Sequence, residues 1–177
     1  MKVTFRDCLK LKSLSRGVVV AGEKSLDNRI KNVSVLDAGS AEEAVLYNGK
    51  SEELILTTFS GMKNDTKTQV EAIRELAKAG ISGIVIFQRE NAADHHNYRE
   101  VIRTAEEVSM PLVILAAEKG MGYSEIISEV MEKVLYGSNF KNSLINNTIF
   151  HLLNFEKHSS FCLLYTSPSP RDTERSR

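Results

Sequence analysis

Apolar positions along the chain follow two different spacings, and short apolar or β-branched runs bounded by turn residues predict five strands. Two of the central runs, ISGIVIF and PLVILAAE, are almost continuously apolar, which is typical of strands buried on both faces of a parallel sheet. The five predicted strands are Val18–Gly22, Asn32–Asp37, Glu53–Thr58, Ile81–Phe87 and Pro111–Glu118.

Apolar residues at helical spacing lie between and after these runs. The predicted helices are Thr4–Leu11, one or two turns over Ala41–Tyr47, a helix beginning at Thr66, Asn97–Met110, Ser124–Tyr136 and Asn139–Phe155. Thr4 is the expected N-cap of the first helix. Thr66 and Gln69 have the spacing of a capping box, and Gly80 stands where a C′ glycine would end that helix.

From Glu53 to Leu135 the order is strand–helix–strand–helix–strand–helix with short connections. This order predicts an α/β fold, with a mostly parallel sheet of about four to five strands and helices packed on it, followed by a helical C-terminal extension. We expect residues 1–136 to form one domain and residues 137–161 to be a helical linker.

Residues 162–177, CLLYTSPSPRDTERSR, differ in composition from the rest of the chain and hold two of its three prolines. This segment resembles translated sequencing-adapter read-through, and we expect a non-native disordered tail. The alternative is a natural Ser/Pro-rich linker. We derive no function from this segment.

The charge balance limits the classes of partner. Lys and Arg together number 23, as do Asp and Glu, so the composition shows no basic footprint for nucleic acid and no attraction to an anionic membrane. The chain has only two cysteines, and its charged N-terminus has no apolar signal region. A cytoplasmic location is therefore expected.

Three polar residues at strand ends are the candidate ligand-binding residues. Thr57 and Thr58 end one buried strand, and Asp37 ends the strand before it. Ligands of open α/β sheets bind outside the carboxyl ends of the strands, so these side chains are placed to hold a small polar molecule. The alternative is that the threonines bond loop backbone and that Asp37 caps its own loop.

No set of residues in the sequence predicts catalysis, a metal or a cofactor. Glu52 and Glu53 are neighbours on an extended segment and face opposite ways, so they are not a catalytic carboxylate pair. His95 and His96 are adjacent and do not have the spacing of two metal ligands on one helix. Cys8 lacks a partnering base and is expected to be a buried apolar residue.

Six segments in unbroken order resemble the N-terminal domain of the PucR family of bacterial regulators. They are VTFRDCLKL, VVVAGEKSLDNRIKNVSVLDA, ELILTT, AIRELAKAGISGIVIF, AEEVSMPLVILAAE and EIISEVMEKVL, and together they span residues 3–135. Phe59 departs from the resemblance, because the family often has Gly after the two threonines, so the loop there is expected to differ.

The resemblance implies the signal-sensing domain of a cytoplasmic transcription regulator of catabolic genes, not an enzyme. The implied effector is a purine catabolite, a sugar acid or an amino acid, and the implied assembly is a homodimer. DNA would be read only by a C-terminal helix-turn-helix that this chain lacks. The alternative is a dimerisation or interdomain-contact module without a ligand, which the long apolar stripe of Ser124–Phe155 favours.

Overall fold

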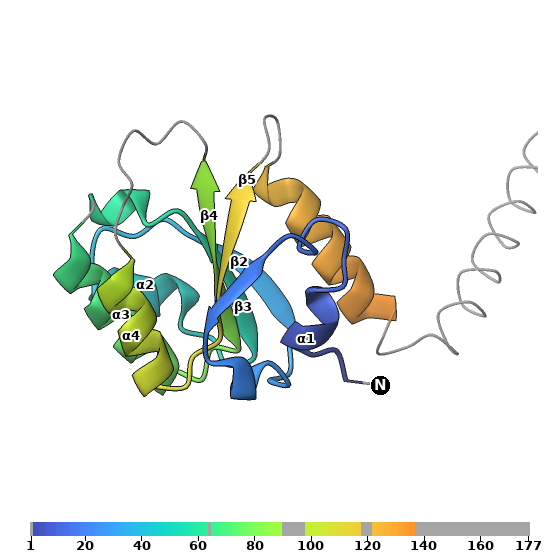
Figure 1. Cartoon of the computed structure of the whole chain (residues 1–177), viewed down its shortest axis with the longest axis horizontal. Helices are drawn as coiled ribbons and strands as arrows, with labels where there is room; N and C mark the ends of the chain where they lie inside the picture. The colour runs from blue at the N-terminus through green and yellow to red at the C-terminus, as the bar shows by residue number, and fades with distance from the viewer. Residues whose placement is uncertain (1, 64, 90–97, 118–121, 137–177) are drawn as a thin grey trace, which may run out of the picture. The chain divides into compact units, whose positions relative to one another are not determined.

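A computed structural model of the chain describes residues 2–63, 65–89, 98–117 and 122–136. They form a five-stranded sheet with helices on both faces, as Figure 1 shows. The strands are β1 (Val18–Ala21), β2 (Asn32–Leu36), β3 (Glu53–Thr57), β4 (Gly83–Arg89) and β5 (Leu112–Ala117). The predicted α/β class with a mostly parallel sheet of four to five strands is confirmed.

The strand order in the sheet is β1-β5-β4-β3-β2. Strands β2 to β5 are parallel and follow one another in chain order, and β1 pairs antiparallel with β5 at the far edge. Consecutive parallel neighbours with right-handed crossovers place all the connecting helices on one face. The parallel strands therefore lack the reversal of strand order at which ligands of doubly wound sheets usually bind.

Three helices cover that face: α2 (Ala41–Asn48), α3 (Thr66–Lys78) and α4 (Arg99–Glu107). Ile55, Ile84 and Leu112 of the sheet pack there against Ile73 of α3 and Val101 of α4, all of them fully buried. Because side chains alternate across a strand, Leu54 and its equivalents in β4 and β5 point to the other face.

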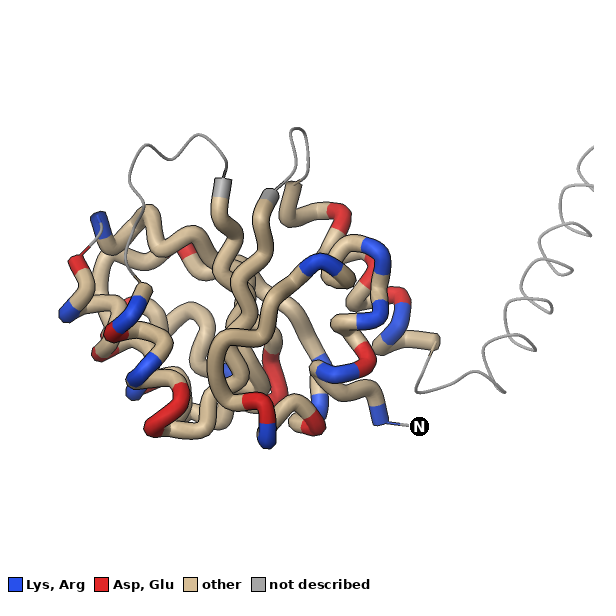
Figure 2. The backbone as a smooth tube through the Cα atoms, viewed as in Figure 1, with Lys and Arg blue, Asp and Glu red and all other residues tan. Residues whose placement is uncertain are grey.

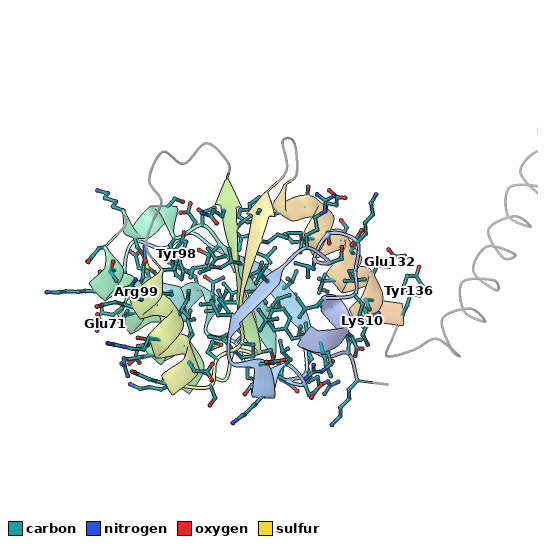
Figure 3. All side chains as sticks on the ribbon, in the orientation of Figure 1. Lys10, Glu71, Tyr98, Arg99, Glu132 and Tyr136 are labelled. Atoms are coloured by element: carbon teal, nitrogen blue, oxygen red, sulfur yellow. The ribbon has the colours of Figure 1, made fainter. Side chains whose placement is uncertain are left out.

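The short helix α1 (Phe5–Cys8) and a helix over residues 123–136 cover the second face. Phe5, Ile126 and Val130 are fully buried there among Leu54 and other sheet residues. Figure 3 places Glu132 and Tyr136 on the outer side of this layer, and both are exposed. Figure 2 shows the Lys, Arg, Asp and Glu positions concentrated on the helices and loops around a sheet that carries few of them.

Several helix boundaries differ from the prediction by one to three residues, and α4, for example, ends at Glu107 and not at Met110. Thr4 is the N-cap of α1, as predicted, and forms a capping box with Asp7, but the helix ends at Cys8. The capping box predicted for Thr66 and Gln69 is wrong: Asp65 is the N-cap of α3, and its carboxylate accepts from the Lys67 amide at 3.1 Å. The Gln69 amide, which Thr66 was expected to cap, donates instead to the Asp65 carbonyl at 3.0 Å, so Thr66 becomes the first helical residue.

The chain divides into two compact units, Met1–Ser138 and Asn139–Arg177. The predicted helix over 139–155, the tail from 162 and His95 and His96 lie outside the described residues, so the expectations for them stay predictions. Within the residues that are described, none of the helices combines the length and apolarity needed to cross a bilayer.

Candidate functional site

Thr57, the first of the sequence-predicted ligand residues, is fully buried at the carboxyl end of β3. Its hydroxyl donates to the Leu36 carbonyl at 3.0 Å and accepts from the Phe59 amide at 2.9 Å. The hydroxyl thus joins β2 to β3 and shapes the turn that follows. Both of its roles are used inside the fold, which matches the structural alternative for this residue.

Thr58 and Asp37 lie nearer the surface at the same edge. The Thr58 hydroxyl donates to the Ser60 hydroxyl at 2.9 Å. Asp37 is exposed, and a Cβ built on Gly61 would come within 3.0 Å of its Oδ1 and 2.5 Å of the Ala38 carbonyl oxygen. The two loops therefore meet at Gly61, which brings Asp37 and the threonines together at one edge. That they bind a ligand stays a prediction.

Two left-handed residues bracket the short 3-10 helix η2 (Ser60–Met62) after β3. Phe59 has φ 55° and Lys63 has φ 46°, values that favour glycine. In the PucR family, glycine often stands at the position that Phe59 occupies in this chain. Phe59 nevertheless has a left-handed backbone, which glycine adopts readily. Its side chain is only 2% exposed and packs into the core beside α3.

The extended segment predicted for both Glu52 and Glu53 is wrong at Glu52, whose backbone is left-handed with φ 62° just before β3 begins. Glu53 is 2% exposed at the start of β3, and its Oε1 accepts from the side-chain Nδ2 of Asn32 at 3.3 Å. Burial raises the pKa of the Glu53 carboxyl above its ordinary value. Glu52 lies outside the sheet and pairs with Lys31, whose ammonium lowers the pKa of Glu52.

A hollow of about 360 Å³ opens at the other edge of the sheet, where the parallel strands begin. In Figure 1 the arrowheads of β4 and β5 point away from this edge. Residues 28–29, 52, 77, 80–82 and 108–110 line the hollow, which we call the amino-edge hollow. These segments come from the loop before β2, the residue before β3, and the ends of α3 and α4.

The turns after α3 and α4 have the same geometry around the amino-edge hollow. After α3, the Gly80 amide donates to Ala77 and the Ile81 amide to Leu76. After α4, the Ser109 and Met110 amides make the corresponding bonds, to Glu106 and Ala105. Both are Schellman motifs, which place a left-handed residue at C′.

The left-handed residue is Gly80 in the first motif, with φ 81°, and Ser109 in the second, with φ 55°. Glu52, also in the hollow, has φ 62°. Two strained residues that are not glycine therefore share one concave surface.

Charged groups gather on one side of the amino-edge hollow. Arg29 Nη1 lies 3.7 Å from Glu52 Oε1, and Glu52 is also paired with Lys31. The Ser82 hydroxyl donates to the Arg29 carbonyl, and the Glu52 amide donates to the Gly80 carbonyl at 3.1 Å. Backbone and side-chain bonds thus fix the loop that presents Arg29.

Sequence reasoning missed this hollow because it directed attention to the carboxyl ends of the strands. The segments that line the hollow are far apart in the chain. In the sequence, the ends of α3 and α4 look like ordinary helix C-termini. Gly80 was recognised only as a C′ residue. The one available signal was Ser109, which stands between the α4 pattern and Met110–Pro111 where a C′ glycine is common.

Comparison with known proteins identifies the family to which this domain belongs. The family model described as the purine catabolism regulatory protein-like family, PucR, matches residues 7–134, which is more than half of the chain. The chain belongs to the PucR family. The match begins within α1 and ends within the last described helix, so it covers both helical layers and the whole sheet.

A purine catabolism regulatory protein from Bacillus subtilis (strain 168) is 22% identical to the chain over 152 residues. The match covers 86% of this chain and 27% of the Bacillus protein. The chain therefore spans about a quarter of the length of this curated relative.

Proposed function

We propose that this chain is the signal-sensing N-terminal domain of a PucR-type transcription regulator of catabolic genes, acting in the cytoplasm and without catalytic activity. The observation that carries the proposal is the family match over residues 7–134. In the proposed arrangement the domain reports a small-molecule effector, and DNA is read by a helix-turn-helix outside this sequence. The name of the Bacillus relative makes purine catabolites one of the effector classes to test.

The shape of the domain supports a binding role. Ligand sites in soluble proteins are concave and combine an apolar floor with a few fixed polar groups. The amino-edge hollow is lined by the charged residues Arg29 and Glu52 together with the apolar residues Ile81 and Met110. The balanced charge of the chain supports the view that it does not contact DNA by itself.

Thermal unfolding of the purified chain in the presence of purine catabolites, sugar acids and amino acids tests the sensing role. A ligand at 100 times its Kd stabilises the native state by about 2.7 kcal/mol, so a true effector raises the melting temperature by several degrees. We expect compounds of one class to do so. If the folded chain is stabilised by none of them, the domain is not a sensor of these compounds.

A second candidate, a dimerisation module, is favoured by exposed apolar residues on α2. Leu46 is 76% exposed and Tyr47 is 68% exposed. Sedimentation velocity of the chain and of its Leu46→Glu variant separates the two proposals. A dimer that this variant dissociates, with no ligand response in the parent, would favour the second candidate.

A further inference from the structure

We propose that the amino-edge hollow is the effector site, and that it takes a small zwitterion carrying a carboxylate and an ammonium group, as an α-amino acid does. Arg29 would hold the carboxylate, and the ends of α3 and α4 with the Ser109 hydroxyl would hold the ammonium. This inference rests on the proposed sensing function and adds to it the place and the chemical class of the ligand.

The positive side of the hollow follows from an imbalance of charge. Glu52 is one carboxylate between two cations, Arg29 and Lys31. Its Oε2 pairs closely with Lys31, whereas Arg29 Nη1 lies 3.7 Å from its Oε1, too far for a hydrogen bond. The Arg29 guanidinium has five donors in a planar fork that matches a carboxylate, and its side chain is 38% exposed.

The negative side of the hollow is made by two helix ends. Helices α3 and α4 both end here, and residues 77, 80 and 108–110 at their C-termini line the hollow. Each helix C-terminus carries the equivalent of about half a negative charge, which favours a cation beside the last turn. Two such ends at one surface provide a place for an ammonium group.

The floor and the size of the hollow limit the ligand further. Ile81 and Met110 are buried and Ala77 and Val108 are partly buried, so these four residues supply the apolar part of a lining that is otherwise polar. A volume of about 360 Å³ lies at the lower end of the range for small-molecule sites. A compact ligand with charged ends and a short apolar body fits this arrangement better than a polyhydroxylated sugar acid.

Backbone strain also marks the rim of the hollow, as it marks Phe59 and Lys63 at the other edge of the sheet. Ser109 holds at φ 55° the position that Gly80 holds at the end of α3. Non-glycine residues in this conformation cost of order 1 kcal/mol and cluster where a side chain has a function. The retained serine places a hydroxyl at the rim, where it can accept from an ammonium group.

The test combines binding with mapping on the whole 177-residue chain. The probes are the standard α-amino acids, together with, for each one that binds, the amine that lacks its carboxylate and the acid that lacks its amino group. Isotope-edited NMR spectra would report which backbone amides respond. We expect an amino acid to bind, both truncated compounds to bind at least tenfold more weakly, and the amides of residues 80–82 and 109–110 to shift.

Arg29→Gln tests the carboxylate contact, and Arg74→Gln is its matched control, because Arg74 is also half-exposed and ion-paired, to Glu107 at 3.0 Å, but does not line the hollow. We expect Arg29→Gln to weaken binding about tenfold or more and Arg74→Gln to leave it unchanged. If Arg29→Gln fails to fold, the NMR map of the parent chain decides.

Three outcomes would overturn the inference. Shifts confined to residues 58–62 at the carboxyl edge would place the ligand elsewhere and leave the sensing function standing. Binding only by purine catabolites or sugar acids would leave the sensing function standing and refute the ligand class. No response to any compound of the three classes would refute the sensing function itself.

Discussion

Ser13 and Glu129 are joined by two hydrogen bonds to a single carboxylate oxygen. The Ser13 amide donates to Glu129 Oε2 at 3.0 Å, and the Ser13 hydroxyl donates to the same atom at 2.7 Å. The two residues are 116 positions apart, so the contact ties the loop after α1 to the helix over residues 123–136. It joins the first and last described elements of the layer that covers the second face of the sheet.

Replacing Glu129 by Ala should loosen that layer. Hydrogen bonds to a charged acceptor contribute more than neutral ones, and Ser13 is only 4% exposed, so its donors would lose their partner away from water. We expect the variant to lose about 1–2 kcal/mol of unfolding free energy in urea. Glu132→Ala, exposed on the same helix, is the control and should lose less than about 0.5 kcal/mol. Equal losses would mean that the Ser13 contact contributes nothing specific.

Phe59 and Lys63 share a left-handed backbone and should respond to glycine with opposite signs. Glycine relieves about 1 kcal/mol of strain at each position. Lys63 is exposed, so Lys63→Gly should stabilise the chain by about 0.5–1 kcal/mol.

Phe59 is buried, and losing a buried phenyl ring costs about 3–5 kcal/mol, so Phe59→Gly should destabilise by about 2–4 kcal/mol. Urea denaturation of both variants checks the pair. A stabilised Phe59→Gly variant would show that strain outweighs burial at this turn.

Glu53 should make stability depend on pH. Burial raises the pKa of its carboxyl above the ordinary value of 4.5, so the native state binds the proton more tightly than the unfolded chain does. Above the raised pKa the carboxylate is charged in both states and its burial opposes folding. That penalty fades as the pH falls toward 4.5.

The variant Glu53→Gln keeps an acceptor for the side-chain Nδ2 of Asn32 and carries no charge. We expect its melting temperature to exceed that of the parent chain at pH 7 and the difference to shrink steadily down to pH 4.5. Thermal scans across that range measure it. Glu71→Gln, on the exposed side of α3, should show no such trend. A difference for Glu53→Gln that is constant with pH would exclude the charge as the cause.

Cys8 should be unreactive in the folded chain. It is fully buried, and burial raises the pKa of its thiol from 9.0 to about 12, which lowers the thiolate fraction at neutral pH about a thousandfold. In a Cys162→Ser background, we expect a thiol reagent at pH 7.5 to modify Cys8 in urea far faster than under native conditions. Equal rates would mean that the α1 layer opens freely.

The prediction of the α/β fold depended on the central strands, whose apolar runs are so continuous that only burial on both faces accounts for them. The site could be predicted less well. Thr57 was a candidate because it ends a buried strand. Its hydroxyl donates to the Leu36 carbonyl and accepts from the Phe59 amide. No local pattern distinguishes a hydroxyl that faces a ligand from one that bridges two strands, because the partner that decides between them is 21 residues away.

By itself the sequence determined the alternation of strands and helices, the burial of Cys8 and the resemblance to the PucR family. These features follow from local spacing and composition, which are properties of the sequence and do not depend on the tertiary structure. Only the tertiary structure decided the antiparallel edge strand, the pairing of Ser13 with Glu129 and the hollow beneath Arg29. Each of these depends on segments brought together by long-range packing, and long-range contacts leave no periodic trace in the sequence.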